Sequence, residues 1–206
     1  MKTFKLLIVF ILFLTSCNDD KKTSSETEKI TEKEPTEIAS TAKTAKKKPD
    51  TNGTFLCKIN GKDWSYTKTS GIVDTHPKTK KRTAIITFKK KLDKGSESVQ
   101  LFYDGDNYQL EKATAILKTP KKGGGTMSAM YQLLNEGGKR LPDSKISGTL
   151  DLSNSKGATG TAEVTNMKIR FEEGQLEDQS MAIVSFSPLN FSGIGYSDLH
   201  KVFGNK

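Results

Sequence analysis

The stretch TFLCKINGKDWSYT, residues 54–67, has the pattern of two short β-strands joined by a tight turn. Phe55, Cys57 and Ile59 recur at every second position, which is the period of a strand with one buried face. Asn60-Gly61 follows, the dipeptide favoured where both central residues of a type I′ turn need a positive φ. The stretch therefore predicts a β-hairpin.

A two-residue turn at Asn60-Gly61 fixes the register of this hairpin. The predicted cross-strand pairs are Phe55 with Tyr66, Cys57 with Trp64, and Lys58 with Asp63. The first two pairs form an apolar face, and the third is an opposite-charge pair on the other face, both of which stabilise paired strands. Trp64 is therefore expected to be a core residue.

The chain after this hairpin continues as short segments with the two-residue period of strands. The apolar phase changes near Thr165-Asn166, which indicates a β-bulge. Several short strands at this spacing predict an all-β domain, an antiparallel β-sandwich or a partly open barrel. The expected strands are residues 83–88, a hairpin over 97–117 with its turn at 104–106, and residues 145–152, 161–171 and 180–186.

Two later segments allow different interpretations. In residues 126–136, Met127, Met130, Tyr131 and Leu134 fit a helical face, whereas alternate residues from Met127 fit a strand. The neighbouring segments are strands, which favours the strand. Residues 197–203 fit one C-terminal helical turn.

The first 16 residues have the layout of a secretory signal. Lys2 and Lys5 precede an apolar run over residues 6–14, which is shorter than the roughly 20 residues that a spanning helix needs. Leu14-Thr15-Ser16-Cys17 then resembles the lipobox of bacterial lipoproteins. That resemblance implies cleavage before Cys17 and acylation of its thiol and new amino group, and two or more acyl chains anchor a protein stably.

Further short motifs resemble lipoproteins of the Bacteroidota. Asn18-Asp19-Asp20 is similar to the acidic residues that follow the lipidated cysteine in that group, which implies the outer membrane, with either the periplasmic or the cell-surface leaflet open. Residues 59–64, Ile-Asn-Gly-Lys-Asp-Trp, and the later Ser147-Gly148-Thr149 resemble uncharacterised β-sandwich lipoproteins. The resemblance implies that fold and carries over no catalytic residue.

Composition divides the rest of the chain into two parts. Residues 17–52 are rich in Lys, Glu, Thr and Ser and contain no aromatic residue, which predicts a disordered tether. The whole chain has 33 basic and 24 acidic residues, of which residues 1–16 hold two basic ones and the tether eight of each sign. The domain over residues 53–206 therefore keeps 23 basic and 16 acidic residues, a net charge of +7.

This excess of basic residues is the first candidate for a binding site. A basic surface attracts polyanions, which outside the cell would be acidic glycans or lipopolysaccharide, and no nucleic acid is expected. An envelope protein is the other expected partner. Lysines on exposed strands also block edge-to-edge aggregation, which is the alternative interpretation. The candidate polyanion-binding residues are Lys78, Lys80, Lys81, Arg82, Lys89 and Lys91.

Motifs for catalysis, metal binding and cofactor binding do not emerge from the sequence. Cys57 remains the single thiol once Cys17 is acylated, and the strand pattern around it predicts a core residue. The favoured hypothesis is a non-enzymatic, lipid-anchored binding or structural module of the cell envelope that needs no cofactor. The alternative is a hydrolase of glycan or peptide with a site assembled from scattered residues: Asp74, His76, Asp104 and Asp106.

Overall fold

A computed structural model describes residues 53–137 and 140–203 of the chain. The predicted signal peptide (residues 1–16), the predicted lipidation site Cys17 and the predicted tether (residues 17–52) lie outside the described residues. Within the described ranges, helices long and apolar enough to cross a membrane do not occur.

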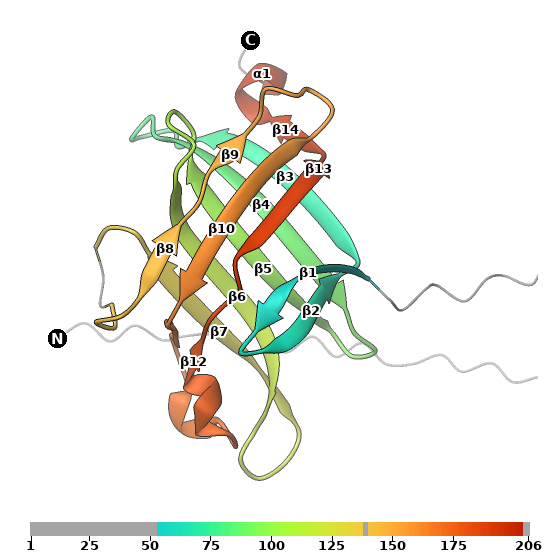
Figure 1. Cartoon of the computed structure of the whole chain (residues 1–206), viewed down its shortest axis with the longest axis vertical. Helices are drawn as coiled ribbons and strands as arrows, with labels where there is room; N and C mark the ends of the chain where they lie inside the picture. Colours follow the sequence, from blue (N-terminus) through green and yellow to red (C-terminus); the bar gives the residue numbers. More distant parts are fainter. Residues whose placement is uncertain (1–52, 138–139, 204–206) are drawn as a thin grey trace, which may run out of the picture. The chain divides into compact units, whose positions relative to one another are not determined.

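The larger layer of the domain is an eight-stranded sheet, shown behind the smaller layer in Figure 1. Its strand order is β12-β11-β7-β6-β5-β4-β3-β14, and its neighbours are antiparallel except for β14 and β3, which are parallel. The strands are β3 (Lys68–Thr75), β4 (Arg82–Lys91), β5 (Ser96–Asp104), β6 (Leu110–Pro120), β7 (Thr126–Leu134), β11 (Met167–Ile169), β12 (Ile183–Val184) and β14 (Tyr196–Asp198).

The smaller layer consists of two separate sheets. One has the order β13-β10-β8, with β9 also paired to β10, and the other is the hairpin β1-β2. The strands are β1 (Thr54–Ile59), β2 (Lys62–Tyr66), β8 (Lys145–Ser147), β9 (Leu150–Asp151), β10 (Ala158–Thr165) and β13 (Leu189–Ile194). Three short helices complete the described chain: η1 (Glu173–Gln175), η2 (Gln179–Ala182) and α1 (Leu199–Phe203).

The all-β prediction is confirmed, and the sheets pack face to face as a sandwich without closing into a barrel. The core lies between the layers, where alternate residues of β4 to β7 are buried. Aromatic rings cross it, with Phe88 5.2 Å from Tyr66 and 5.4 Å from Phe191 between ring centroids. The Tyr103 hydroxyl donates a hydrogen bond to the Thr161 carbonyl at 2.9 Å, which ties the large sheet to β10.

The first hairpin forms as predicted at its turn. Cys57 pairs with Trp64 and Lys58 with Asp63, and both Cys57 and Trp64 are buried. Asn60 and Gly61 have φ values of 47° and 79°, which a type I′ turn requires. The prediction that Trp64 belongs to the core is confirmed.

The predicted pair of Phe55 with Tyr66 is wrong. The register shifts between Phe55 and Cys57, so that Phe55 pairs with Ser65 and Tyr66 pairs with Thr54. The extra residue of this bulge is accommodated by turning the Leu56 side chain into the core, where it is 5% exposed, and leaving Phe55 53% exposed.

Residues 161–171 do not form the single strand that the sequence predicts. We expected one strand with a bulge near Thr165-Asn166, but β10 and β11 belong to different sheets. Asn166 lies between them with φ at 55°, a left-handed conformation that Asn tolerates better than most residues. The change of apolar phase therefore marks the point where the chain passes from the smaller layer to the larger one. Phe171, which the predicted strand included, is 59% exposed.

The other predicted elements are found in the structure, some of them with different bounds. Strand β7 confirms the strand interpretation of residues 126–136. The C-terminal helical turn expected over residues 197–203 is confirmed for α1, Leu199–Phe203, whereas Ser197 and Asp198 belong to strand β14. The second hairpin is also confirmed, but its turn covers more residues than expected, because Tyr103 pairs with Leu110. Residues 180–186 form the end of η2 and the two-residue strand β12 instead of one buried strand.

Candidate functional site

The candidate site is an opening in the smaller layer between β1 and β13. Near the β1-β2 turn, β1 is tied to the segment before β13: the Ser187 N–H donates to the Lys58 carbonyl at 2.8 Å, and the Asn60 N–H to the Ser185 carbonyl at 3.0 Å. Among the described residues, backbone hydrogen bonds between β1 and β13 themselves are absent. The two strands diverge from this junction, as Figure 1 shows.

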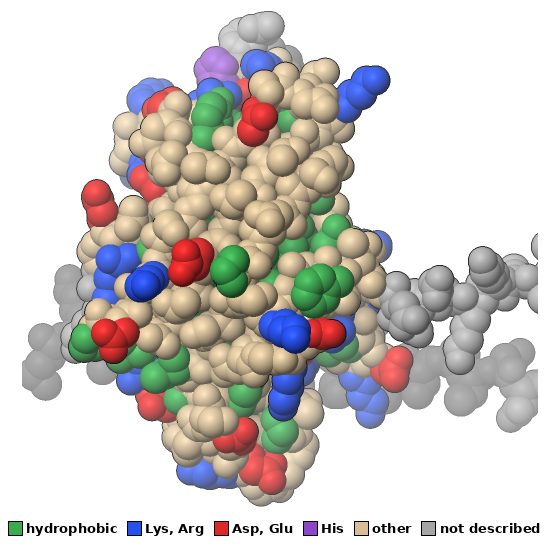
Figure 2. Space-filling view, in the orientation of Figure 1, with side chains coloured by type: hydrophobic (Ala, Val, Ile, Leu, Met, Phe, Trp, Pro, Cys, Tyr) green, Lys and Arg blue, Asp and Glu red, His purple; other side chains and the backbone are tan. Residues whose placement is uncertain are grey.

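The divergence leaves a groove of about 640 Å³, which we call the edge groove. It continues from the opening over β9 and β10. Figure 2 shows this face covered largely by uncharged atoms, with hydrophobic side chains near the hairpin. Residues from three distant parts of the chain line the edge groove: Thr54, Phe55, Leu56, Tyr66, Thr149, Leu150, Asp151, Thr159, Gly160, Thr161, Asn190, Phe191 and Ser192.

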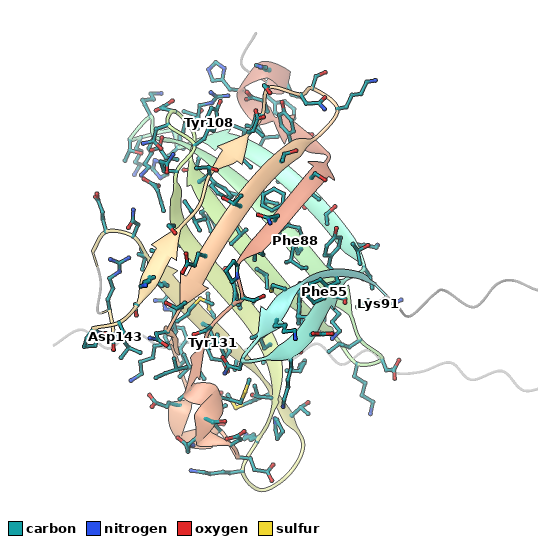
Figure 3. All side chains as sticks on the ribbon, viewed as in Figure 1. Phe55, Phe88, Lys91, Tyr108, Tyr131 and Asp143 are labelled. Atoms are coloured by element: carbon teal, nitrogen blue, oxygen red, sulfur yellow. The ribbon has the colours of Figure 1, made fainter. Side chains whose placement is uncertain are left out.

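Apolar side chains form the deeper part of the edge groove and polar ones its upper walls. Leu56 and Phe191 are 5% and 7% exposed, whereas Phe55 extends outward from the bulge at the rim. Figure 3 places Phe55 on the hairpin and Phe88 on the large sheet behind it. A Cβ at Gly160 would lie 2.6 Å from the Phe191 ring, so only glycine leaves room for that ring at this position.

One charged residue, Asp151, belongs to the lining of the edge groove. The backbone N–H and the hydroxyl of Ser153 donate to its carboxylate and lower the pKa of Asp151, so this group is anionic at neutral pH. The lining set contains no Lys, Arg or His residue. The groove therefore favours neutral or cationic ligand groups over anionic ones.

The backbone of β13 adds hydrogen-bonding capacity to one wall. Asn190 lies opposite Thr161 in the antiparallel ladder, and the Thr161 N–H donates away from β13, to the Thr149 carbonyl at 2.8 Å. In such a ladder both peptide groups of one residue point to the same side. The Thr161–Asn190 pair is therefore not hydrogen-bonded, and the N–H and C=O of Asn190 point toward the open edge.

A second cavity, of about 390 Å³, lies at the opposite side of the hairpin near its turn. Its principal contact joins the Trp64 Nε1–H to Glu97 Oε2 at 2.9 Å. The Lys90 ammonium lies 3.7 Å from the same Oε2, and the other carboxylate oxygen of Glu97, Oε1, accepts the Lys118 backbone N–H at 3.1 Å. Because both oxygens of Glu97 already have partners, we assign this cluster a structural role in holding the hairpin on the large sheet.

The predicted polyanion-binding residues occupy two separate places on β4 and the loop before it. One place is the loop before β4 and the first residue of the strand, with Lys78, Lys80, Lys81 and Arg82. The other is the end of the strand, with Lys89 and Lys91. Arg82 and Lys91 are nine residues apart, a distance of about 30 Å along a strand. The six residues therefore do not form one patch.

Two of these basic residues are already paired with carboxylates. Lys81 Nζ lies 2.6 Å from Glu111 Oε1, and the Glu111 hydrogen bond raises the Lys81 pKa. Arg82 donates to Asp198 Oδ2, also at 2.6 Å, and the Asp198 side chain is only 6% exposed. Lys81 and Arg82 thus neutralise acidic neighbours, which leaves less charge for an external polyanion.

The residues of the alternative hydrolase site have local structural roles. His76 lies in an exposed loop, where its Nδ1 accepts the Thr79 N–H at 3.2 Å. Asp104 Oδ1 accepts two backbone N–H groups of its own turn, which lower the pKa of Asp104. Within residues 53–137 and 140–203, carboxylates do not hydrogen-bond to His76, and groups of three or more His, Cys, Asp or Glu placed to hold a metal do not occur.

No family model matches the chain, and comparisons with curated proteins and with solved structures also give no match. We therefore infer the function from the edge groove and the motifs of the chain.

Proposed function

We propose that the chain is a lipid-anchored protein of the bacterial outer membrane whose β-sandwich binds a ligand in the edge groove without catalysing a reaction. The lipobox ending at Cys17 supports the anchor, and its resemblance to Bacteroidota lipoproteins supports the location. The observation that carries the binding role is the diverging pair of β1 and β13, which exposes a backbone edge beside the outward-pointing Phe55.

The edge groove is favoured over the basic residues as the binding site for two reasons. Its lining combines apolar depth with hydroxyl, amide and peptide groups, the mixture that typifies binding sites. The basic residues are divided between two ends of β4, and Lys81 and Arg82 already have acidic partners. Binding of an acidic glycan by the basic residues is therefore the alternative outcome of the binding experiment.

The test compares Phe55→Ala with Phe171→Ala, because both side chains are more than half exposed but only Phe55 lines the edge groove. The mature chain, with Cys17→Ser to prevent lipidation, is screened against a glycan array and a random peptide library at two salt concentrations. We expect Phe55→Ala to weaken binding of the selected ligand at least about tenfold, with Phe171→Ala unchanged and little effect of salt.

The proposal is wrong if the two substitutions have equal effects. It is also wrong if the selected ligands are acidic glycans whose binding falls steeply with salt and is lost on Lys78→Ala and Lys80→Ala. The anchor is tested separately in a cell fraction: Cys17→Ser in the full chain should move the protein from the membrane fraction to the soluble fraction.

A further inference from the structure

The smaller layer of the sandwich is interrupted at the edge groove. Hairpin β1-β2 and the sheet β13-β10-β8 both pack on the large sheet, yet they are separate sheets, and in the described part of the chain backbone hydrogen bonds join them near the β1-β2 turn. Beyond Lys58 and Ser187, the strands diverge instead of pairing. One additional strand beside β13 would extend that sheet toward β1.

The wall of the groove formed by β13 is suited to hydrogen bonding with a strand. β13 spans Leu189–Ile194, and among the strands of residues 53–137 and 140–203 it pairs with β10 alone, so its other side is an open edge there. The peptide groups of Asn190 point to that side. Unpaired N–H and C=O groups on an edge strand are a template for pairing with another chain.

We propose that the occupant of the edge groove is an extended polypeptide segment of a partner protein, which adds as a strand to β13. This inference rests on the proposed function and specifies its ligand. Main-chain hydrogen bonds to β13 would supply affinity, and alternate side chains would supply specificity. Edge groups of a strand recur about every 6.8 Å, the spacing at which another strand presents its own N–H and C=O groups.

The lining of the groove defines the side chains that the segment needs. Side chains on its inner face would contact Leu56, Tyr66 and Phe191, so apolar residues fit at every second position. Asp151 lies on β9, across β10 and β13 from this free edge, so the added segment would not contact its carboxylate. The expected motif is a short segment with apolar residues at every second position.

The test uses two substitutions at one position, Asn190→Pro and Asn190→Ala. Proline removes the outward N–H of an edge residue without removing a ladder bond of the folded domain, whereas alanine keeps the N–H and removes only the exposed side chain. Peptides are selected from a random 12-residue library displayed on phage against the mature Cys17→Ser chain. Their dissociation constants are measured by fluorescence anisotropy.

We expect Asn190→Pro to weaken binding of the selected peptides at least about tenfold and Asn190→Ala to change it less than about twofold, because recognition is by the main chain. Equal losses in both variants would show recognition of the side chain and overturn the inference. Thermal melting followed by circular dichroism shows whether each variant folds.

A second measurement uses the unmodified binding surface, so it does not depend on the folding of the proline variant. The selected peptide is synthesised with one N-methyl group at each position in turn. Binding should fall at every second position, since alternate N–H groups of an added strand face β13. Uniform or absent losses would overturn strand addition.

The outcomes separate this inference from the proposed function. Glycan binding that depends on Phe55, with no Phe55-dependent peptide, would leave the groove as the binding site and exclude a peptide as its occupant. The absence of any Phe55-dependent ligand would overturn both proposals.

Discussion

Cys57 lies where β1 meets the core, with 0% of its surface exposed. Burial raises the pKa of its thiol to about 12, because the thiolate would lose its hydration there. The thiolate is the reactive form of cysteine, so Cys57 is shielded both sterically and by its protonation state.

This environment predicts that Cys57 does not react while the domain is folded. At pH 8, the mature Cys17→Ser chain should show no modification by iodoacetamide within hours, and one equivalent of modification in 6 M guanidinium chloride. Intact-protein mass spectrometry measures both. Rapid labelling of the native protein would mean that β1 opens readily or that the thiol is activated.

The neighbours Phe55 and Leu56 show the effect of shifting the strand register by one residue. Period-two alternation predicted that Phe55 would be buried beside Cys57, but the bulge buries Leu56 instead and exposes the larger ring. A bulge adds one residue to one strand, and nothing in the local apolar pattern distinguishes the two registers when Phe and Leu are adjacent. For this reason the sequence did not predict that Phe55 is exposed at the rim of the edge groove.

At the level of elements, hairpin β1-β2 is fastened to the large sheet through Trp64 and Glu97. The Glu97 side chain is 12% exposed and binds both the Trp64 indole N–H and the Lys118 backbone N–H. Hydrogen bonds to a charged group contribute about 1.5–3 kcal/mol, and a partner left unpaired in a buried site is costly. This cluster therefore sets how firmly the hairpin, and with it one wall of the edge groove, is held.

A double-mutant cycle tests that fastening. Trp64→Phe and Glu97→Ala should each lower the free energy of unfolding by about 2 kcal/mol, with a coupling energy of about 1 kcal/mol between them. Urea denaturation followed by circular dichroism measures all four proteins. Asp63→Ala serves as the control, since its pairing with Lys58 is exposed at 3.9 Å and such surface pairs contribute little. Additive effects of the first two substitutions would contradict direct coupling.

The sequence predicts local elements better than their assignment to layers. The Asn60-Gly61 turn and the alternation in residues 126–136 depend on neighbouring residues, so the hairpin and strand β7 could be predicted. At Asn166 the chain passes from one layer to the other, and this shifts the apolar alternation by one residue, as a β-bulge would. The sequence pattern is the same in both cases, and only the packing of the folded domain distinguishes them. The edge groove is lined by residues near positions 55, 150, 160 and 190, and a local sequence motif does not predict that such distant segments lie together.

At the scale of the whole molecule, three protonated groups in the core link stability to alkaline pH. Burial raises the pKa of Cys57 from 9.0 to about 12 and that of Tyr131 from 10.0 to about 12, and it also raises the pKa of Tyr103. A folded state that keeps these protons while the unfolded state loses them becomes less stable as pH rises. The loss begins near pH 9 and continues to about pH 12.

We therefore expect the free energy of unfolding to fall between pH 9 and 11, by up to about 1.4 kcal/mol per pH unit for each group that ionises only on unfolding. Urea denaturation at pH 7, 9, 10 and 11 measures the slope. Tyr131→Phe should lower stability at pH 7, because the Tyr131 hydroxyl donates to the Met181 carbonyl at 2.7 Å, and should also flatten the alkaline slope. An unchanged slope in this variant would show that Tyr131 does not contribute.

The position of β1 has a mechanical consequence. Thr54 opens the first strand of the described domain and also lines the edge groove, so a pull transmitted through an anchor at Cys17 would enter the sandwich beside the bound partner. Tension between the membrane and that partner would then reach β13 through β1 and the junction of Lys58 with Ser187, while β2 would pass part of it to the eight-stranded sheet. On the proposed function, the hydrogen bonds of this junction and those of the hairpin with the large sheet together set the force at which the coupling yields.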